Sequence, residues 1–151
     1  MRRPAIIVDL DETLADTRHR MHVVTGRDYN ADDYEIYYRN LEKDEVYPHI
    51  WRLVLSMAKT HEIIFMTGRP EKYRDQTHKW IWRKTGLIPY DTLFMRPHDT
   101  LECDTKIKAM LYEKHVKPKW TVEFVLEDRT KVVKMWRELG LPCLQVQQSD
   151  Y

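Results

Sequence analysis

Apolar residues occur along this chain in short unbroken runs, separated by stretches in which they recur every three or four positions. The first run, from Ala5 to Val8, is mostly β-branched, which is typical of a strand buried on both faces of a parallel sheet. Similar runs predict four further strands, at 63–66, 92–95, 122–126 and 143–146. The helical spacing between the runs predicts helices over 46–57, 73–84, 104–115 and 130–139.

Single residues mark where some of these helices should begin and end. Pro70 suits the first turn of a helix, and Gly86 is expected to stop that helix. Thr130 is expected to cap the last helix, which Gly140 closes.

The alternation of strands and helices predicts the fold class α/β, with a mostly parallel sheet of about five strands and helices on both faces. The polar, tyrosine-rich stretch 15–45 has no clean period, so we expect a small cap-like insertion after the first strand. A chain of 151 residues has room for one core, so we expect a single domain over 1–151.

Composition excludes some classes of function. The 25 basic and 24 acidic residues leave a formal charge of +1, so no basic field covers the whole molecule and any polyanion must be held locally. The two cysteines, Cys103 and Cys143, form no CxxC motif, which disfavours a zinc site or a disulfide framework and fits a reducing cytoplasm. No apolar run is long enough to span a membrane, so we expect a soluble cytoplasmic protein with no membrane partner.

Polar residues follow several of the predicted strands. They are Asp9, Asp11 and Thr13 after the first strand, Thr67 and Arg69 after the second, Asp104 and Lys108 beyond the third, and Glu127 and Asp128 after the fourth. The carboxyl ends of parallel strands share one sheet edge, so these side chains are expected to converge there. Several carboxylates together suit a hard divalent cation, and Mg²⁺ is the expected cofactor.

This set of residues predicts phosphoryl transfer. Asp9 can act as a nucleophile that forms an aspartyl-phosphate, and Asp11 can protonate the leaving oxygen and then activate water. Thr67 can donate to a phosphoryl oxygen, and Lys108 can neutralise charge on the transferring group. Spacing alone leaves Lys106 as an alternative lysine. It also leaves Asp104 and Lys108 as an ordinary surface ion pair, because they lie four positions apart.

The residues named above resemble, in order and spacing, the four motifs of the haloacid dehalogenase (HAD) superfamily, so a HAD-like Rossmannoid fold is implied. The segment from Glu127 to Arg137, followed by Gly140 and Cys143, resembles the phosphatase domain of phage-type polynucleotide kinase/3′-phosphatases. The chain contains no GxxxxGK[ST] phosphate loop, so we expect a phosphatase without the kinase half.

The resemblance implies roles for individual residues. Asp9 would be the nucleophile and Asp11 the general acid/base. The implied Mg²⁺ ligands are Asp9, the Asp11 main-chain carbonyl and Asp128, with Glu127 beside them. Substrate would be held by Thr67 and Lys108, with Asp104 orienting the lysine and with Thr13, Arg20, Gly68 and Arg69 nearby. Two positions depart from the family pattern: Glu12 replaces a glycine, and Glu127 replaces an aspartate.

The function implied is a Mg²⁺-dependent phosphomonoesterase that removes a terminal 3′-phosphate from DNA or RNA, with nucleic-acid 3′ ends and a separate kinase or ligase as partners. Tyrosines of the insertion could stack on bases, and arginines could contact backbone phosphates: Arg18, Arg20, Arg27, Arg69, Arg74 and Arg83. Three alternatives stay open. They are a small-molecule HAD phosphatase acting on nucleotides or sugar phosphates, a phosphoacceptor signalling module, and an inactive nucleic-acid-binding relative.

Overall fold

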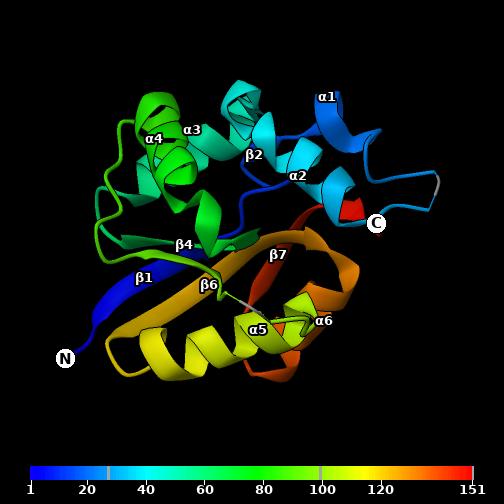
Figure 1. Ribbon diagram of the computed structural model, residues 1–151. Coiled ribbons are helices and arrows are strands. Elements are labelled where there is room, and N and C mark those ends of the chain that lie inside the picture. Colours follow the sequence, from blue (N-terminus) through cyan, green and yellow to red (C-terminus); the bar gives the residue numbers. More distant parts are fainter. Residues whose placement is uncertain (27, 99, 151) are drawn as a thin grey trace.

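Five parallel strands form the central sheet of the computed structural model, which describes residues 1–26, 28–98 and 100–150 (Figure 1). The strands lie in the order β5-β4-β1-β6-β7. Their bounds are β1 Arg3–Val8, β4 Glu62–Pro70, β5 Leu93–Arg96, β6 Trp120–Arg129 and β7 Cys143–Ser149. The predicted α/β class with a five-stranded parallel sheet is confirmed.

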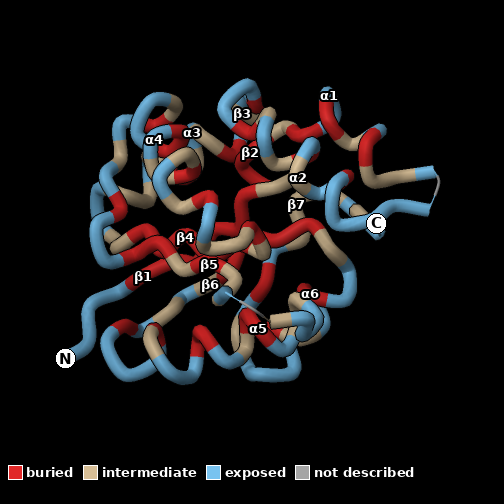
Figure 2. Tube along the Cα trace, in the orientation of Figure 1, coloured by how far each residue is buried: buried red, intermediate tan, exposed pale blue. Residues whose placement is uncertain are grey.

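Helices cover both faces of the sheet, as expected. In Figure 1, α3 (Pro48–Met57) and α4 (Arg74–Thr85) lie on one face, and α5 (Asp104–Leu111) and α6 (Thr130–Glu138) lie on the other. Alternate residues of β1 enter two separate cores, with Ile6 and Val8 in one and Ala5 and Ile7 in the other. This double burial explains the unbroken apolar run of the first strand, which is red along its inner part in Figure 2.

The central place of β1 determines where its following residues lie. Val8 is in register with Phe65 of β4 on one side and with Leu126 of β6 on the other. The backbone amide of Asp9 then donates to the carbonyl of Leu126, at 3.1 Å. Residues that leave β1, β4 and β6 therefore meet at one edge of the sheet.

The stretch 15–45 is more regular than its sequence indicates. It contains β2 (Ala15–Asp16), α1 (Arg18–Met21), α2 (Ala31–Arg39) and the 3₁₀ turn η1 (Leu41–Lys43), and then enters β3 (Glu45–Val46), which pairs antiparallel with β2. The side chain of Asn30 accepts from the backbone amides of Asp32 and Asp33, and the Asp33 side chain accepts from the Asn30 amide. This capping box is the local sequence signal for α2, and the analysis of apolar spacing did not detect it.

Three expectations about helix ends were wrong. Pro70 lies in extended backbone at the end of β4, and the 3₁₀ turn η2 (Glu71–Tyr73) precedes α4. Thr130 is the first residue of α6 and not its cap, since Arg129 holds the N-cap position. The helix expected to reach residue 115 ends as α5 at Leu111, and a π-helical turn, η3 (Tyr112–Val116), continues it. Across the residues that the structure describes, none of the helices is both long and apolar enough to cross a membrane.

Candidate active site

Three carboxylates meet at the carboxyl edge of the sheet. Asp9 follows β1, and Glu127 and Asp128 lie near the end of β6, and all three are at least nine-tenths buried. The hydroxyl of Thr13 lies 2.9 Å from Oδ2 of Asp9 and 3.1 Å from Oδ1 of Asp128, so it can donate to either carboxylate. The carboxylates expected to converge therefore do so, and Thr13 lies between Asp9 and Asp128.

One lysine enters this cluster from α5. The Nζ of Lys108 donates to Oδ1 of Asp9 and to Oε2 of Glu127, each at 2.8 Å, and its side chain is 2% exposed. Lys106 instead pairs with Glu102 at the surface, at 3.3 Å. The structure thus places Lys108, and not Lys106, against the carboxylates, and the surface ion pair between Asp104 and Lys108 is not formed.

The carboxylates suit a divalent cation. Asp9, Glu127 and Asp128 each offer an oxygen within 4.8 Å of the others. The Oδ2 of Asp128 is buried and accepts no hydrogen bond from any residue that the structure describes. Burial, with the charges of Asp9 and Glu127, raises the pKa of Asp128 well above its ordinary value, and burial with the charge of Glu127 likewise raises the pKa of Asp9. Crowded carboxylates of this kind fit Mg²⁺, because a hard cation prefers oxygen ligands and removes their repulsion.

Asp11 is bound by two arginines. Its Oδ1 accepts from Nε and Nη2 of Arg69, at 2.9 and 2.6 Å, and from Nη2 of Arg20, at 3.1 Å. Burial alone would raise the pKa of Asp11, but the charges of Arg69 and Arg20 outweigh it and hold the pKa below its ordinary value. Asp11 is therefore ionised at neutral pH in the resting protein.

Asp44, which was not among the residues predicted from the sequence, also binds both arginines. Asp44 is fully buried and accepts from Arg20 and Arg69. It follows the turn η1 and not a strand of the main sheet, so the rule that sites gather at strand ends did not find it. Arg20 also lies over the ring of Tyr37, with 4.0 Å between its guanidinium carbon and the ring centroid.

Asp104 binds arginines, not the lysine that it was expected to orient. Its Oδ1 accepts from Nη2 of Arg96 at 2.5 Å, and its Oδ2 accepts from Nη1 of Arg129 at 2.8 Å. A Cβ atom on Gly68 would lie 2.5 Å from Oδ1 of Asp104, so only glycine allows this approach. Arg96 ends β5 and carried no motif in the sequence, which is why it was not identified.

A cavity of about 710 Å³ opens over these residues. Asp9, Asp11, Thr67 and Lys108 are among the residues that line it. Tyrosines form much of the remaining wall, where Tyr34 stacks on Tyr38 and Tyr38 contacts Tyr73 at ring-centroid distances of 6.3 and 5.0 Å. Charged and aromatic groups therefore face one space, which is large enough for a nucleoside as well as a phosphate.

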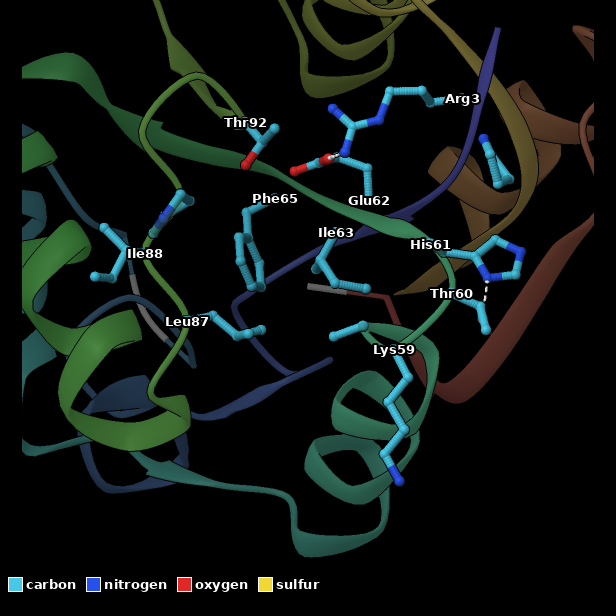
Figure 3. A pocket seen from close by; sticks show the side chains of 13 residues that line it. Arg3, Lys59, Thr60, His61, Glu62, Ile63, Phe65, Leu87, Ile88 and Thr92 are labelled. Atoms are coloured by element: carbon cyan, nitrogen blue, oxygen red, sulfur yellow. Dashed lines mark hydrogen bonds and ion pairs between the residues drawn. The ribbon is translucent and has the colours of Figure 1, made fainter. Parts of the chain in front are cut away.

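A second hollow lies at the opposite edge of the sheet. It has a volume of about 300 Å³, and Arg3 and Glu62, which begin β1 and β4, line it with Phe65 and His61 (Figure 3). The carboxylate cluster is at the other end of these strands. The hollow is therefore separate from the candidate active site.

Comparison with known proteins identifies the class of this site. A family model described as "Polynucleotide kinase PNKP phosphatase domain" matches residues 3–151. The chain belongs to this family. The phosphatase class expected from the motifs is thereby confirmed, and this chain is a PNKP-type phosphatase domain with a HAD-like fold.

Individual relatives agree with this assignment. A "Putative bifunctional polynucleotide kinase/RNA ligase" of Autographa californica nuclear polyhedrosis virus is 30% identical over 149 residues, which is 97% of this chain and 20% of the viral protein. A chain in the "Structure of Pnkp1/Rnl/Hen1 complex" has 36% identity and a TM-score of 0.76, covering 99% of this chain and 48% of that chain. A haloacid dehalogenase-like hydrolase from Streptococcus pneumoniae, 15% identical with a TM-score of 0.64, shares the fold over 93% of this chain and 83% of its own. The PNKP-type phosphatase thus spans about half of the first solved relative and a fifth of the viral one.

Glu12 shows how this PNKP-type phosphatase accommodates a carboxylate where the family pattern has glycine. Its φ of 60° is the left-handed conformation that glycine adopts freely. Its Oε1 accepts from the amide and the hydroxyl of Thr17, at 2.8 and 2.7 Å, and its Oε2 accepts from the Tyr47 hydroxyl at 2.8 Å and from Nε2 of Gln147 at 3.2 Å. The turn is therefore kept, and hydrogen bonds offset its backbone strain.

The other departure, Glu127, turns its side chain toward Lys108. Its Oε1 accepts from the backbone amides of Asp128 and Arg129, at 3.1 and 3.3 Å, while Oε2 receives the lysine. Both carboxylate oxygens of Glu127 therefore accept hydrogen bonds from groups of the protein. Of the three carboxylates, Asp128 is the one with an unused oxygen among the described residues.

Of the arginines named as possible phosphate contacts, Arg20 and Arg69 lie together on Asp11, and neither they nor the other described ones line the cavity. Arg20 and Arg69 are buried behind Asp11. Arg18 pairs with Asp16 and Arg74 pairs with Glu71, both at 2.5–2.6 Å on the surface, and Arg83 is exposed on α4. Arg27 lies outside the described residues.

Proposed function

We propose that this phosphatase removes a terminal 3′-phosphate from DNA or RNA and leaves a 3′-hydroxyl for ligation or polymerisation. The observation that carries the proposal is the position of Asp9, whose carboxylate contacts Lys108 in a cavity that tyrosines also line. Relatives whose names include polynucleotide kinase, RNA ligase and RNA repair support a nucleic-acid substrate.

In the first step of the proposed reaction, a carboxylate oxygen of Asp9 attacks phosphorus and the bond from phosphorus to the 3′ oxygen breaks. The leaving oxygen takes a proton from Asp11. Because two arginines keep Asp11 ionised at rest, it must gain that proton as substrate enters. A phosphate that binds in the cavity beside Asp11 brings negative charge close to this carboxylate and favours its protonated form.

In the second step, water attacks the phosphorus of the aspartyl-phosphate and Asp11 accepts a proton from it, which Asp11 afterwards releases to solvent. The bond between phosphorus and Asp9 breaks, so inorganic phosphate leaves and the carboxylate is restored. The arginines stabilise Asp11 as it returns to its ionised form.

Two further side chains would hold the phosphoryl group. The Thr67 hydroxyl lines the cavity and accepts from the backbone amide of Arg69 at 3.2 Å, which leaves its proton for a phosphoryl oxygen. The Lys108 ammonium supplies positive charge beside the attacking oxygen. The groups that would hold Mg²⁺ are Asp9, Asp128 and the Asp11 carbonyl, with Glu127 adjacent. A bound Mg²⁺ would neutralise charge on the phosphoryl oxygens.

The tyrosine wall would bind the nucleoside that carries the phosphate. Tyr29 and Tyr34 are 49% and 41% exposed, and their rings contact edge to face at 5.3 Å. Exposed aromatic faces of this kind stack on bases of any sequence. The same chemistry at Asp9 would also serve a small-molecule phosphatase, so nucleotides or sugar phosphates are the second candidate substrates. A small substrate would not need the tyrosine wall, which is why we prefer the polynucleotide.

We also propose that the phosphatase acts with a kinase and a ligase, in one polypeptide or as separate proteins. The names of two relatives support this proposal. One is a putative bifunctional polynucleotide kinase/RNA ligase, and the other comes from the Pnkp1/Rnl/Hen1 RNA repair complex. The free cysteines Cys103 and Cys143 are consistent with the reducing cytoplasm as its location.

The test is a panel of oligonucleotides carrying a phosphate at either the 3′ or the 5′ end, a 3′-mononucleotide and a sugar phosphate, each assayed with Mg²⁺. We expect phosphate release from 3′-phosphorylated oligonucleotides to exceed that from every other substrate by at least ~10-fold. Asp9→Asn should abolish release. Equal rates for the oligonucleotide and the mononucleotide would favour the small-molecule alternative, and full activity of Asp9→Asn would overturn the mechanism.

A further inference from the structure

A carboxylate outside the sheet edge organises the two buried arginines of the site. The Oδ1 of Asp44 accepts from Nε of Arg20 at 2.8 Å, and its Oδ2 accepts from Nη2 of Arg20 at 2.7 Å and from Nη2 of Arg69 at 3.0 Å. All three side chains are at most 1% exposed. Burying ions at this depth is costly unless every charge is paired, so these contacts hold the three groups together as a unit.

Each arginine lies between two carboxylates. On the side toward the cavity Arg20 and Arg69 bind Asp11, and on the side away from it they bind Asp44. Asp11 lines the cavity, whereas Asp44, Arg20 and Arg69 are not among the residues of its wall, so the arginines act on a phosphate there through their charge and not by contact. The unit therefore has two positive and two negative formal charges, and only one of its carboxylates can touch substrate.

The position of Asp44 is itself fixed from several directions. Its main-chain carbonyl accepts from Nε1 of Trp80 on α4, at 2.9 Å. The Nε2 of His19 lies 2.7 Å from its Oδ1. The ring of Trp80 also faces Arg69, with 5.5 Å between guanidinium carbon and ring centroid. A rigid frame thus determines where both guanidinium groups point.

We propose that Asp44 is a positioning residue of this phosphatase, which aims Arg20 and Arg69 at Asp11 and limits the positive charge that they present to phosphate. The inference rests on the phosphatase reaction proposed above. Without Asp44, the arginines would carry uncompensated positive charge, and that charge would hold an incoming phosphate in the cavity more tightly. Because they would no longer be aimed at Asp11, the reaction itself would slow, since tighter ground-state binding does not accelerate chemistry.

A purely structural role makes a different prediction. If Asp44 served only to fasten the stretch 15–45 to the rest of the protein, its loss would lower stability and would weaken or leave unchanged the binding of phosphate. Only the positioning role predicts that phosphate binds more tightly while turnover falls.

Asp44→Asn separates these roles because it removes the charge and keeps the shape. With Mg²⁺ present, we expect kcat for a 3′-phosphorylated oligonucleotide to fall at least ~10-fold, and the dissociation constant of inorganic phosphate, measured by calorimetry, to fall by roughly 3- to 10-fold. Asp16→Asn is the matched control. This acidic residue lies in the same stretch but pairs with Arg18, whose side chain is 73% exposed, so both quantities should stay at the wild-type values.

A charge-balanced pair of variants tests the same idea if Asp44→Asn fails to fold. Arg20→Gln alone should weaken phosphate binding, and adding Asp44→Asn to it should restore phosphate affinity to within about twofold of wild type, since one positive and one negative charge are then both absent. Phosphate affinity that does not recover in the double variant would overturn the proposal.

Two other results would also overturn it: phosphate binding in Asp44→Asn that is unchanged or weaker, and phosphate binding that is absent from both the wild type and the variant. The binding measurement uses inorganic phosphate and does not depend on the substrate. Failure of the wild type to release a 3′-phosphate would therefore refute the proposed function and leave the Asp44 comparison interpretable.

Discussion

The ammonium group of Lys108 lies 2.8 Å from the carboxylate of Asp9, although 99 positions separate the two residues and both are buried. We predict that Lys108→Met lowers kcat at least ~100-fold, because the charge beside the attacking oxygen is lost. Lys106→Met is the control and should keep wild-type kcat, since Lys106 lies at the surface with Glu102. Steady-state phosphate release measures both, and equal losses in the two variants would contradict the assignment of Lys108.

Metal-free protein should become less stable as pH rises. Asp9 and Asp128 have pKa values raised above 3.8 in the folded state, so between about pH 5 and pH 8 the folded protein keeps protons that the unfolded chain has lost. Because the folded state then binds more protons, raising the pH favours unfolding, by up to ~1.4 kcal/mol per pH unit for each retained proton. Thermal melting in chelator at several pH values measures the trend.

Saturating Mg²⁺ should remove most of that trend, since a cation compensates the crowded charge. Asp128→Asn should reduce the trend without metal, because one of the two retained protons is no longer exchanged, while the contribution of Asp9 stays. A metal-free melting temperature that is constant across this pH range would show that the carboxylates are not strained in the way we infer.

Glu12 should be replaceable by glycine at a lower cost than by alanine. Both changes remove the hydrogen bonds to Thr17 and Tyr47. Alanine retains the strain of a φ of 60°, whereas glycine does not. We expect Glu12→Ala to lower the free energy of unfolding by ~2–4 kcal/mol, and Glu12→Gly by about 1 kcal/mol less than that. Urea unfolding gives both values, and a larger loss for glycine would refute the argument from backbone strain.

Gly68→Ala should impair the site, since its Cβ would lie 2.5 Å from Asp104 and force that carboxylate away from Arg96 and Arg129. We predict a fall in kcat/KM of at least ~10-fold. Gly140→Ala is a control at another glycine: it strains a left-handed helix end with no atom within 4 Å of the new Cβ. It should lower the melting temperature and leave the kinetics of the folded protein unchanged.

Tyr34→Ala should distinguish a polynucleotide from a small substrate. Tyr34 stacks on Tyr38 in the cavity wall and is distant in sequence from the phosphate-binding groups. We expect KM for a 3′-phosphorylated oligonucleotide to rise roughly 5- to 50-fold, from the loss of one stacking contact, with kcat for p-nitrophenyl phosphate unchanged. A similar loss of activity toward the oligonucleotide and toward p-nitrophenyl phosphate would indicate that the tyrosines support the fold and do not bind bases.

The strands were predictable because burial on both faces leaves a mark in the sequence. Ile6 and Val8 enter one core and Ala5 and Ile7 the other, so the run is apolar at every position. The carboxylates Asp9 and Asp128 were predictable for a related reason, since they directly follow such runs and parallel strands end at one edge.

What escaped prediction depends on long-range contacts. Asp44 is a polar residue after a short turn, and its importance comes from arginines 24 and 25 positions away. Pro70 could begin a helix or end a strand, and its pairing with Arg96 of β5 decides for the strand. The contacts of Asp44 with the arginines and of Pro70 with Arg96 have no local sequence signal. They join residues that come close only when the protein has folded.

The place of β1 in the middle of the sheet has a consequence for synthesis on the ribosome. The strand that emerges before the others needs β4 and β6 as neighbours, and β6 ends at Arg129. Asp9 thus acquires Lys108 and Asp128 as partners only after the segment through Asp128 has been translated. A nascent chain should consequently have no hydrolytic activity, and its exposed apolar first strand would need protection from aggregation until then.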